Sequence, residues 1–105
     1  MTNPVRVQLR RTKGWRMPPN TVSVARPGRW GNYYRIGGPV FREKGFGKVK
    51  DAAEAVELFR RLCAPHMTDI AQIRGKNLAC WCEIGEPCHA DVLLELANRP
   101  IGIAA

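Results

Sequence analysis

Four residues near the C-terminal end of the chain have side chains suited to metal binding or nucleophilic chemistry. Three cysteines and a histidine fall within ten positions, at Cys80, Cys82, Cys88 and His89. In a β-strand, Cys80 and Cys82 would point to the same face, because successive side chains alternate. Cys88 and His89 follow Pro87 and would occupy the first turn of a helix, whose unpaired N–H groups and dipole stabilise a thiolate or a bound anion. We therefore expect Cys88 to be the most reactive thiol, and Cys88 and His89 are the candidate catalytic residues.

The residue types of this cluster allow three interpretations. In the first, Cys82, Cys88 and His89 line a catalytic or anion-binding site. Asp91, on the same helical turn, would then orient His89 or complement the helix N-terminus. In the second, a zinc ion is the cofactor; the spacing is not that of a standard pair of zinc knuckles, and the ligands would be Cys80, Cys82, Cys88 and His89. In the third, Cys80 is a small buried hydrophobic residue of a central strand.

A second group of residues, between positions 26 and 32, is suited to binding a nucleotide. Arg26 and Arg29 can hold phosphate through paired N–H groups, and Trp30 can stack on a base. Gly31 allows a ligand to approach the backbone, and Asn32 offers a donor and an acceptor to a base edge or a ribose. We expect these five residues to bind the ligand. The alternative is that Trp30 only packs against the edge of the sheet.

Hydrophobic periodicity predicts the elements that position the second group. Apolar and polar residues alternate at 5–9 and 21–25, which predicts two short strands. From 29 to 50 the chain is rich in glycine and aromatic residues, which indicates a long structured loop with a short strand at 39–42.

The C-terminal half predicts helices around one buried strand. Asp51 and Glu54 have the spacing of a capping pair, and the helical pattern that they begin ends at Pro65. A short helix, a buried strand and an amphipathic helix follow, at 68–75, 78–82 and 90–98. This order predicts a small α/β domain in which a short sheet is flanked by helices and a strand–loop–helix unit ends the chain. We expect one domain over the whole chain, with a basic aromatic loop region at 11–50 and a helix–strand–helix region at 51–99.

Charge is distributed unevenly along the 105 residues. The formal net charge is +8, and residues 1–50 contain 12 basic residues against one acidic residue, Glu43. Six of the eight aromatic residues lie in the same half. Cations interleaved with aromatic rings suit a polyanion with flat faces, so we expect a nucleotide or nucleic acid as partner.

Composition excludes several classes of protein. The content of apolar residues is 45% and that of charged residues 25%, which is ordinary for a globular domain and excludes a disordered tail or a coiled coil. No apolar run approaches the roughly 20 residues that span a bilayer, so no membrane partner is expected. The first residues lack a hydrophobic stretch, which favours the cytoplasm, where the four cysteines would be thiols or metal ligands. Nothing in the sequence indicates a protein partner.

Several motifs together resemble a known family, DUF4326, a domain of unknown function of phages and bacteria. They are Gly14–Val22, Arg26–Pro27, Trp30–Asn32, Arg74–Leu78, Cys80–Cys82 and Cys88–Leu93. Members usually read Trp-Gly-Asn-Pro-Phe, where this chain has Tyr33-Tyr34 after the asparagine, and relatives tend to have Val-Tyr-Val-Gly in place of Val22–Ala25. The resemblance implies a phage or prophage setting and no established activity.

These observations predict one site, formed by the N-terminal loops and the Cys-His corner, for a nucleotide or nucleic acid. As an enzyme, the protein would modify or cleave a nucleotide or nucleic acid with the participation of Cys88 or His89. As a non-catalytic module, it would only bind nucleic acid, with a structural zinc ion at the corner.

Overall fold

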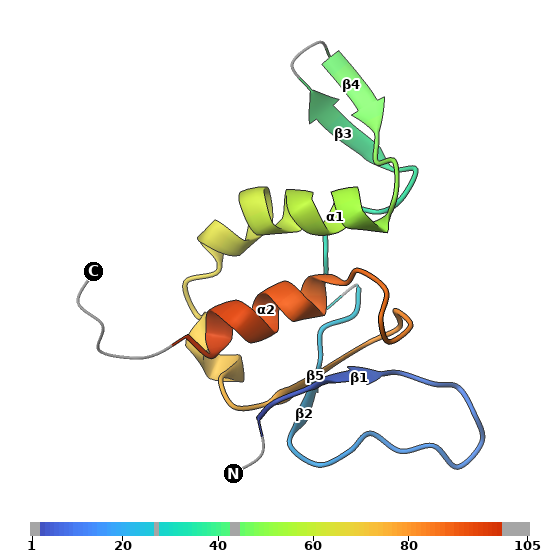
Figure 1. Cartoon of the computed structure of the whole chain (residues 1–105), viewed down its shortest axis with the longest axis vertical. Coiled ribbons are helices and arrows are strands. Elements are labelled where there is room, and N and C mark those ends of the chain that lie inside the picture. Colours follow the sequence, from blue (N-terminus) through green and yellow to red (C-terminus); the bar gives the residue numbers. More distant parts are fainter. Residues whose placement is uncertain (1–2, 27, 43–44, 100–105) are drawn as a thin grey trace.

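A parallel sheet forms the base of the molecule. The computed structural model describes residues 3–26, 28–42 and 45–99. Strands β1 (Arg6–Gln8) and β2 (Thr21–Ser23) each pair in parallel with β5 (Asn77–Cys80), which gives the order β1-β5-β2 (Figure 1). All three strands therefore end at the same edge of the sheet. The predicted strands are confirmed, and each is shorter than its periodicity suggested.

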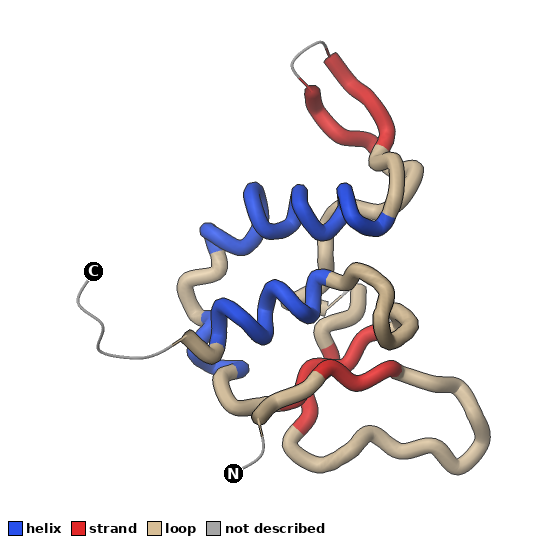
Figure 2. The backbone as a smooth tube through the Cα atoms, in the orientation of Figure 1, coloured by secondary structure: helices blue, strands red, loops and turns tan. Residues whose placement is uncertain are grey.

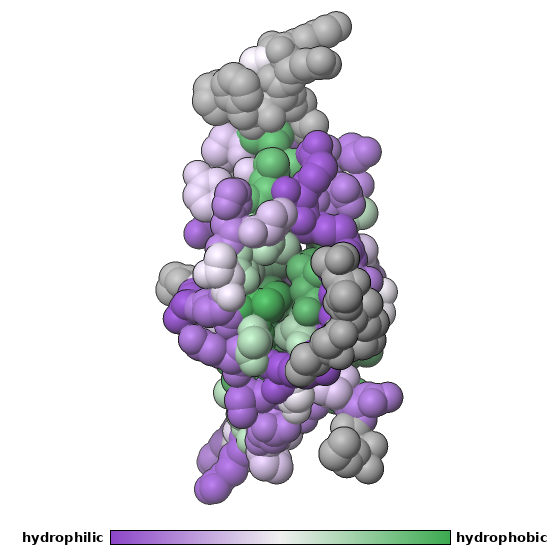
Figure 3. Space-filling model, turned by 90° about the vertical axis from the view of Figure 1, so that its left-hand side faces the viewer, coloured by the Kyte–Doolittle hydropathy of each residue, from purple (hydrophilic) through white to green (hydrophobic). Residues whose placement is uncertain are grey.

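Helices lie together on one side of this sheet. Helix α2 (His89–Ala97) contacts β5 and β1, and α1 (Ala52–Leu58) lies beyond α2 (Figure 1). Hydrophobic side chains gather between these layers and hydrophilic ones surround them on the face shown in Figure 3. The fold is therefore of the α/β class, as predicted.

The first helix begins as the sequence predicts and ends differently. The Asp51 side chain accepts a hydrogen bond from the Glu54 N–H at 2.9 Å, and the Glu54 carboxylate accepts one from the Lys50 N–H at 2.7 Å. After α1 the chain widens into a π-helical turn, η1 (Phe59–Cys63), and then tightens into a 3-10 turn, η2 (Ala64–His66). A second 3-10 turn, η3 (Ile70–Ile73), replaces the predicted short helix.

Two groups of buried side chains hold the structure together. The larger one joins the sheet to the helices and includes Phe59, Leu78 and Leu93. The smaller one includes Val40, Val49, Ala55 and Leu58 and lies where the antiparallel hairpin of β3 (Pro39–Arg42) and β4 (Gly45–Lys48) meets α1. Strand β3 is where the sequence predicts it, whereas β4 lies in the segment expected to be loop.

Long loops connect these elements, as Figure 2 shows for the path from β1 to β2. Among the described residues, no helix is long and apolar enough to cross a membrane.

Candidate functional site

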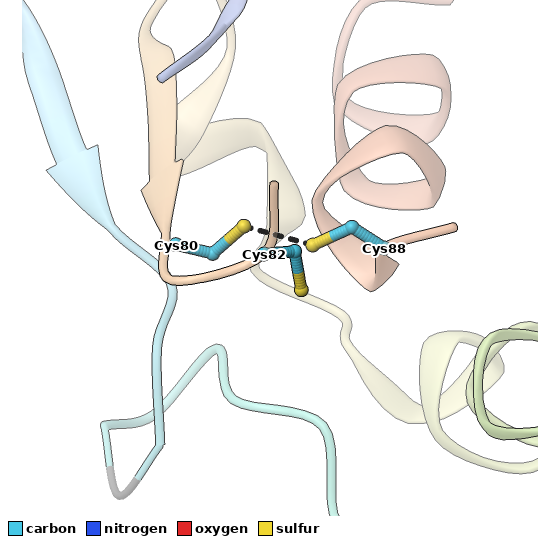
Figure 4. A group of neighbouring side chains, drawn as sticks. All are labelled: Cys80, Cys82 and Cys88. Atoms are coloured by element: carbon cyan, nitrogen blue, oxygen red, sulfur yellow. Dashed lines mark hydrogen bonds between the residues drawn. The ribbon is translucent and has the colours of Figure 1, made fainter. Parts of the chain in front are cut away.

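Three cysteines meet where β5 ends and α2 begins. Cys80 is the last residue of β5, Cys82 lies in the following turn, and Cys88 is the N-cap residue of α2. Their Sγ atoms all lie within 4.8 Å of one another, and those of Cys80 and Cys88 are 2.8 Å apart (Figure 4). We refer to these three residues as the thiol cluster.

Cys80 and Cys88 act as a pair in which one thiol donates to the other. When the Cys88 S–H donates, this hydrogen bond lowers the pKa of Cys80 to about 6. The same hydrogen bond, together with burial, raises the pKa of Cys88, and the neighbouring Ala90 N–H opposes this shift only in part. Cys88 is only 2% exposed. This hydrogen bond and burial therefore oppose the thiolate expected at Cys88 from the helix N-terminus, and the hydrogen bond favours a thiolate at Cys80.

His89, the first residue of α2, is buried beside this pair. Its Nε2 lies 2.7 Å from the carbonyl oxygen of Val24, which can only accept, so Nε2 carries the proton. Burial is the main cause that lowers the pKa of His89, which keeps the ring neutral. Nδ1, which carries the lone pair, lies 3.8 Å from Cys88 Sγ and can accept a hydrogen bond from it. The Val24 carbonyl oxygen therefore orients the ring, which is one of the two roles that the sequence left open for Asp91.

Arg6 on β1 holds the turn that carries the cysteines. Its Nη1 donates to the carbonyl oxygen of Glu86 and to Oδ2 of Asp91, both at 2.8 Å, and Nη2 donates to the carbonyl oxygen of Glu83 at 2.6 Å. The Arg6 side chain is only 7% exposed. Its positive charge also lowers the pKa of Cys80.

Arg6 was not predicted as a functional residue, because alternation within a strand does not determine which of its faces meets the core. Alternation favoured the face of Val5 and Val7, whereas the pairing of Arg6 with Leu78 places Arg6 on the side of the helices. Val5 is exposed. A single basic residue within an alternating strand carries no signal that distinguishes these two orientations.

The loop after β2 is fixed by its own polar side chains. The buried Asn32 donates from Nδ2 to the carbonyl oxygen of Ala55 at 3.0 Å and accepts from the Tyr34 N–H at 2.9 Å. Arg26 donates from Nη1 to the carbonyl oxygens of Asn32 and Tyr34. A Cβ at Gly31 would lie 3.0 Å from the Cα of Arg26, so this glycine permits close packing of the loop. Asn32 and Gly31 therefore shape the loop, and the Asn32 amide is already in use.

Trp30 packs in the core and Arg29 forms an ion pair. Trp30 is 8% exposed and belongs to the larger core. The guanidinium of Arg29 lies 5.2 Å from the centroid of the Trp30 ring and forms an ion pair with Asp69. The structure thus places Trp30 in the packing role that the sequence left as the alternative. Asp91 is also directed elsewhere, because it pairs with Arg6.

Two neighbouring cavities open at this end of the sheet, and the thiol cluster lines the smaller one. The smaller cavity, of about 240 Å³, brings together six of the residues singled out in the sequence: Arg26, Asn32, Cys80, Cys82, Cys88 and His89. The larger cavity, of about 600 Å³, shares Arg26, Asn32 and Arg35 with the smaller one. Among the described residues that line them, none is an aspartate or a glutamate. Both cavities are therefore suited to an anion.

This geometry favours binding over nucleophilic catalysis. Cys88 lines the smaller cavity, but it is buried and its raised pKa disfavours the thiolate that would attack a ligand. Cys82 is half-buried and lines the smaller cavity, but burial raises its pKa as well. Three converging sulfurs and a neutral imidazole are, by contrast, a donor set that zinc accepts.

Comparison with known proteins identifies the family. Residues 7–99 match the family model described as Domain of unknown function (DUF4326), so the chain belongs to this family. No curated protein and no solved structure matches the chain.

Proposed function

We propose that this member of the DUF4326 family binds a phosphate-bearing nucleotide, free or within a nucleic acid, in the two neighbouring cavities. The observation that supports this proposal is the wall that they share, which contains two arginines and no carboxylate among the described lining residues. The smaller cavity lies at the carboxyl ends of the parallel strands β2 and β5, where ligands of α/β proteins usually bind.

Arg26 and Arg35 are the groups that would receive the phosphate. Arg26 uses Nη1 to hold the loop, which leaves the N–H groups of Nε and Nη2. Arg35 is exposed, and within the described part of the chain its guanidinium has no hydrogen bond or ion pair. Charge-assisted hydrogen bonds to phosphate are roughly twice as strong as neutral ones.

The smaller cavity offers a surface for a base. Tyr34, Ile36, Val56 and Trp81 contribute apolar or aromatic atoms to its lining. Its volume of about 240 Å³ is below the roughly 300–1,000 Å³ of sites for drug-sized ligands, so it suits a part of a nucleotide, with the remainder in the larger cavity.

Calorimetric titration tests the nucleotide proposal. We expect at least one of the four common nucleoside 5′-monophosphates to bind about tenfold or more tightly than its nucleoside at low salt, because one charged hydrogen bond contributes about 1.5–3 kcal/mol. Arg35→Gln should remove this preference. Arg61→Gln, which removes the same charge from an exposed position outside both cavities, should retain it. No binding of any monophosphate, or equal affinity for the nucleosides, would overturn the proposal.

The second candidate function, zinc binding by the thiol cluster, rests on the convergence of the three sulfurs. Tetrahedral zinc at about 2.3 Å from each sulfur separates the sulfurs by about 3.8 Å. Cys80 and Cys88, at 2.8 Å, would move apart by about 1 Å. His89 lies outside the group of ligand atoms that are within 4.8 Å of one another, so its Nδ1 atom, 3.8 Å from Cys88 Sγ, would have to move closer to become the fourth ligand. The bond from Nε2–H to the Val24 carbonyl oxygen is typical of a metal-bound histidine. Zinc would lock the turn between β5 and α2.

Metal analysis of protein purified without added zinc tests this candidate. We expect about one zinc per chain, a loss of zinc in Cys82→Ser, and retention in Cys63→Ser, because Cys63 lies outside the thiol cluster. A strong chelator should lower the melting temperature of the unmodified protein. Zinc binding would be excluded if the purified protein contained no zinc and its melting temperature did not change with the chelator.

The proposal also assigns the protein to the cytoplasm, in the phage or prophage setting that the sequence resemblance implies. All four cysteines are free thiols, and reducing compartments maintain this state. Reporter fusions in an expressing bacterium would test the location.

A further inference from the structure

The loop of residues 9–20 carries a cluster of positive charge beside the proposed site. Its exposed cations are Arg10, Arg11, Lys13 and Arg16, and the sequence contains no acidic residue before Glu43. The loop leaves the sheet at the carboxyl end of β1 (Figure 1), and the Leu9 N–H donates to the carbonyl oxygen of Cys80 at 2.8 Å. The segment that carries the cations therefore begins next to Cys80, the last residue of β5.

Trp81 connects this loop to the smaller cavity. Its ring is 47% exposed, although Trp81 also belongs to the cavity lining. The guanidinium of Arg11 lies 4.8 Å from the centroid of this ring. A cation above an exposed indole is an arrangement that binds an unpaired base by stacking and its phosphate by charge.

The remaining cations of the loop are not used to hold the fold. For Arg10, Lys13 and Arg16, no hydrogen bond or ion pair of the side chain is found among the described residues, in contrast to Arg6. Two exposed acidic residues, Glu83 and Glu86, lie on the neighbouring turn, and the four cations of the loop outnumber them. The local excess of positive charge suits successive phosphates.

We infer that the natural ligand is a single-stranded nucleic acid. One of its nucleotides occupies the cavities, the base of the next nucleotide stacks on Trp81, and the phosphates that follow lie along loop 9–20. This inference rests on the proposed nucleotide site. A single strand is required because a base must be unpaired both to stack on Trp81 and to enter a cavity of about 240 Å³.

Fluorescence anisotropy with ligands of increasing length tests the inference on the full chain. The probes are a nucleoside monophosphate, single strands of about four and about eight nucleotides, and a duplex of the longer sequence. We expect the longer strand to bind at least about tenfold more tightly than the monophosphate, and the duplex to bind more weakly. A plot of the logarithm of the association constant of the longer strand against the logarithm of the salt concentration should have a slope of about −0.7 for each phosphate contacted.

Two sets of variants locate the strand. Arg10→Gln/Lys13→Gln should remove most of the gain from length and reduce the salt slope by about 1.4, while monophosphate binding stays unchanged. Arg61→Gln/Arg99→Gln carries the same charge change on exposed residues outside loop 9–20 and outside both cavities and should behave as the unmodified protein. Trp81→Leu, which keeps an apolar side chain in the lining, should weaken strand binding about fivefold or more.

The outcomes separate this inference from the function on which it rests. Monophosphate binding without a gain from length, or equal binding of duplex and single strand, would overturn the inference and leave the nucleotide site in place. Absence of both monophosphate and strand binding would overturn the nucleotide site, and the inference with it.

Discussion

Two kinds of segment at the same edge of the sheet differ in how far their polar side chains hold the backbone. The turn between Cys80 and Cys88 is held by three hydrogen bonds from Arg6, and the loop after β2 is held by Arg26 and Asn32. Loop 9–20, within the described residues, has one internal hydrogen bond, from the Trp15 N–H to the carbonyl oxygen of Thr12.

This difference separates arginines that build the pocket from arginines that remain available to a partner. The guanidinium of Arg6 is nearly enclosed and its donors are in use, so it contributes to the position of the thiols. Exposed cations such as Arg10 contribute little to stability, and their charge acts over the surface. Substitutions of the two kinds of residue should therefore separate effects on folding from effects on binding.

The largest loss of stability should come from Trp30. Removal of this buried ring in Trp30→Ala should lower the free energy of unfolding by about 3–5 kcal/mol, because it leaves a large cavity in the core. Trp81→Ala, at a half-exposed ring, should cost less than about 1 kcal/mol. Urea denaturation measures both. Similar losses would contradict the assignment of Trp30 to packing and Trp81 to the surface.

Substitution of Arg6 should cause the next largest loss of stability. Arg6→Met leaves two carbonyl groups and a carboxylate without their donor, which we expect to cost about 2–3 kcal/mol in urea denaturation. Hydrogen exchange should accelerate in the turn of residues 81–88 in particular. Arg10→Met, on an exposed residue of the same segment, is the control and should stay within about 0.5 kcal/mol. If the two variants unfold alike, Arg6 does not hold the turn.

Asn32 should have an intermediate effect. Asn32→Ala removes the partner of the Ala55 carbonyl and of the Tyr34 N–H, with an expected loss of about 1–3 kcal/mol. It should also weaken monophosphate binding, because the loop carries Arg35. Gln72→Ala, at an exposed position of η3, serves as the comparison in the same thermal and calorimetric measurements. Unchanged binding by a folded Asn32→Ala protein would show that the loop positions itself without this amide.

The smallest effect on stability should belong to loop 9–20. Arg10→Gln/Lys13→Gln should change the free energy of unfolding by less than about 0.5 kcal/mol, since these side chains hold no partner among the described residues. A larger loss, detected by urea denaturation, would mean that the loop contributes to the fold and would remove the contrast between the two segments.

The sequence predicted which elements form and which residues gather at the end of β5. Period-two and helical patterns located β1, β2, α1 and α2, and a short apolar run located β5. The spacing of Cys80, Cys82, Cys88 and His89 was sufficient to expect them together. These predictions depend on local order, which hydrophobic periodicity records.

What the sequence could not predict depends on tertiary pairing. The face of β1 that meets the helices is set by its register with β5, so Arg6 was missed. Asn32 has the same donor and acceptor whether it binds a base or the backbone, and the approach of α1 decides between them. The pKa order within the thiol cluster likewise depends on the 2.8 Å contact between Cys80 and Cys88.

Protection of Cys82 by a bound nucleotide tests the central claim, that the ligand occupies the cavity above the thiol cluster. Cys82 lines the smaller cavity, whereas Cys63 is equally half-buried and lies outside both cavities. Alkylation of each thiol is followed by mass spectrometry with and without a nucleoside monophosphate. At a ligand concentration about ten times Kd, the rate at Cys82 should fall about tenfold while the rate at Cys63 stays constant. An unchanged rate at Cys82 with saturating ligand would contradict the account.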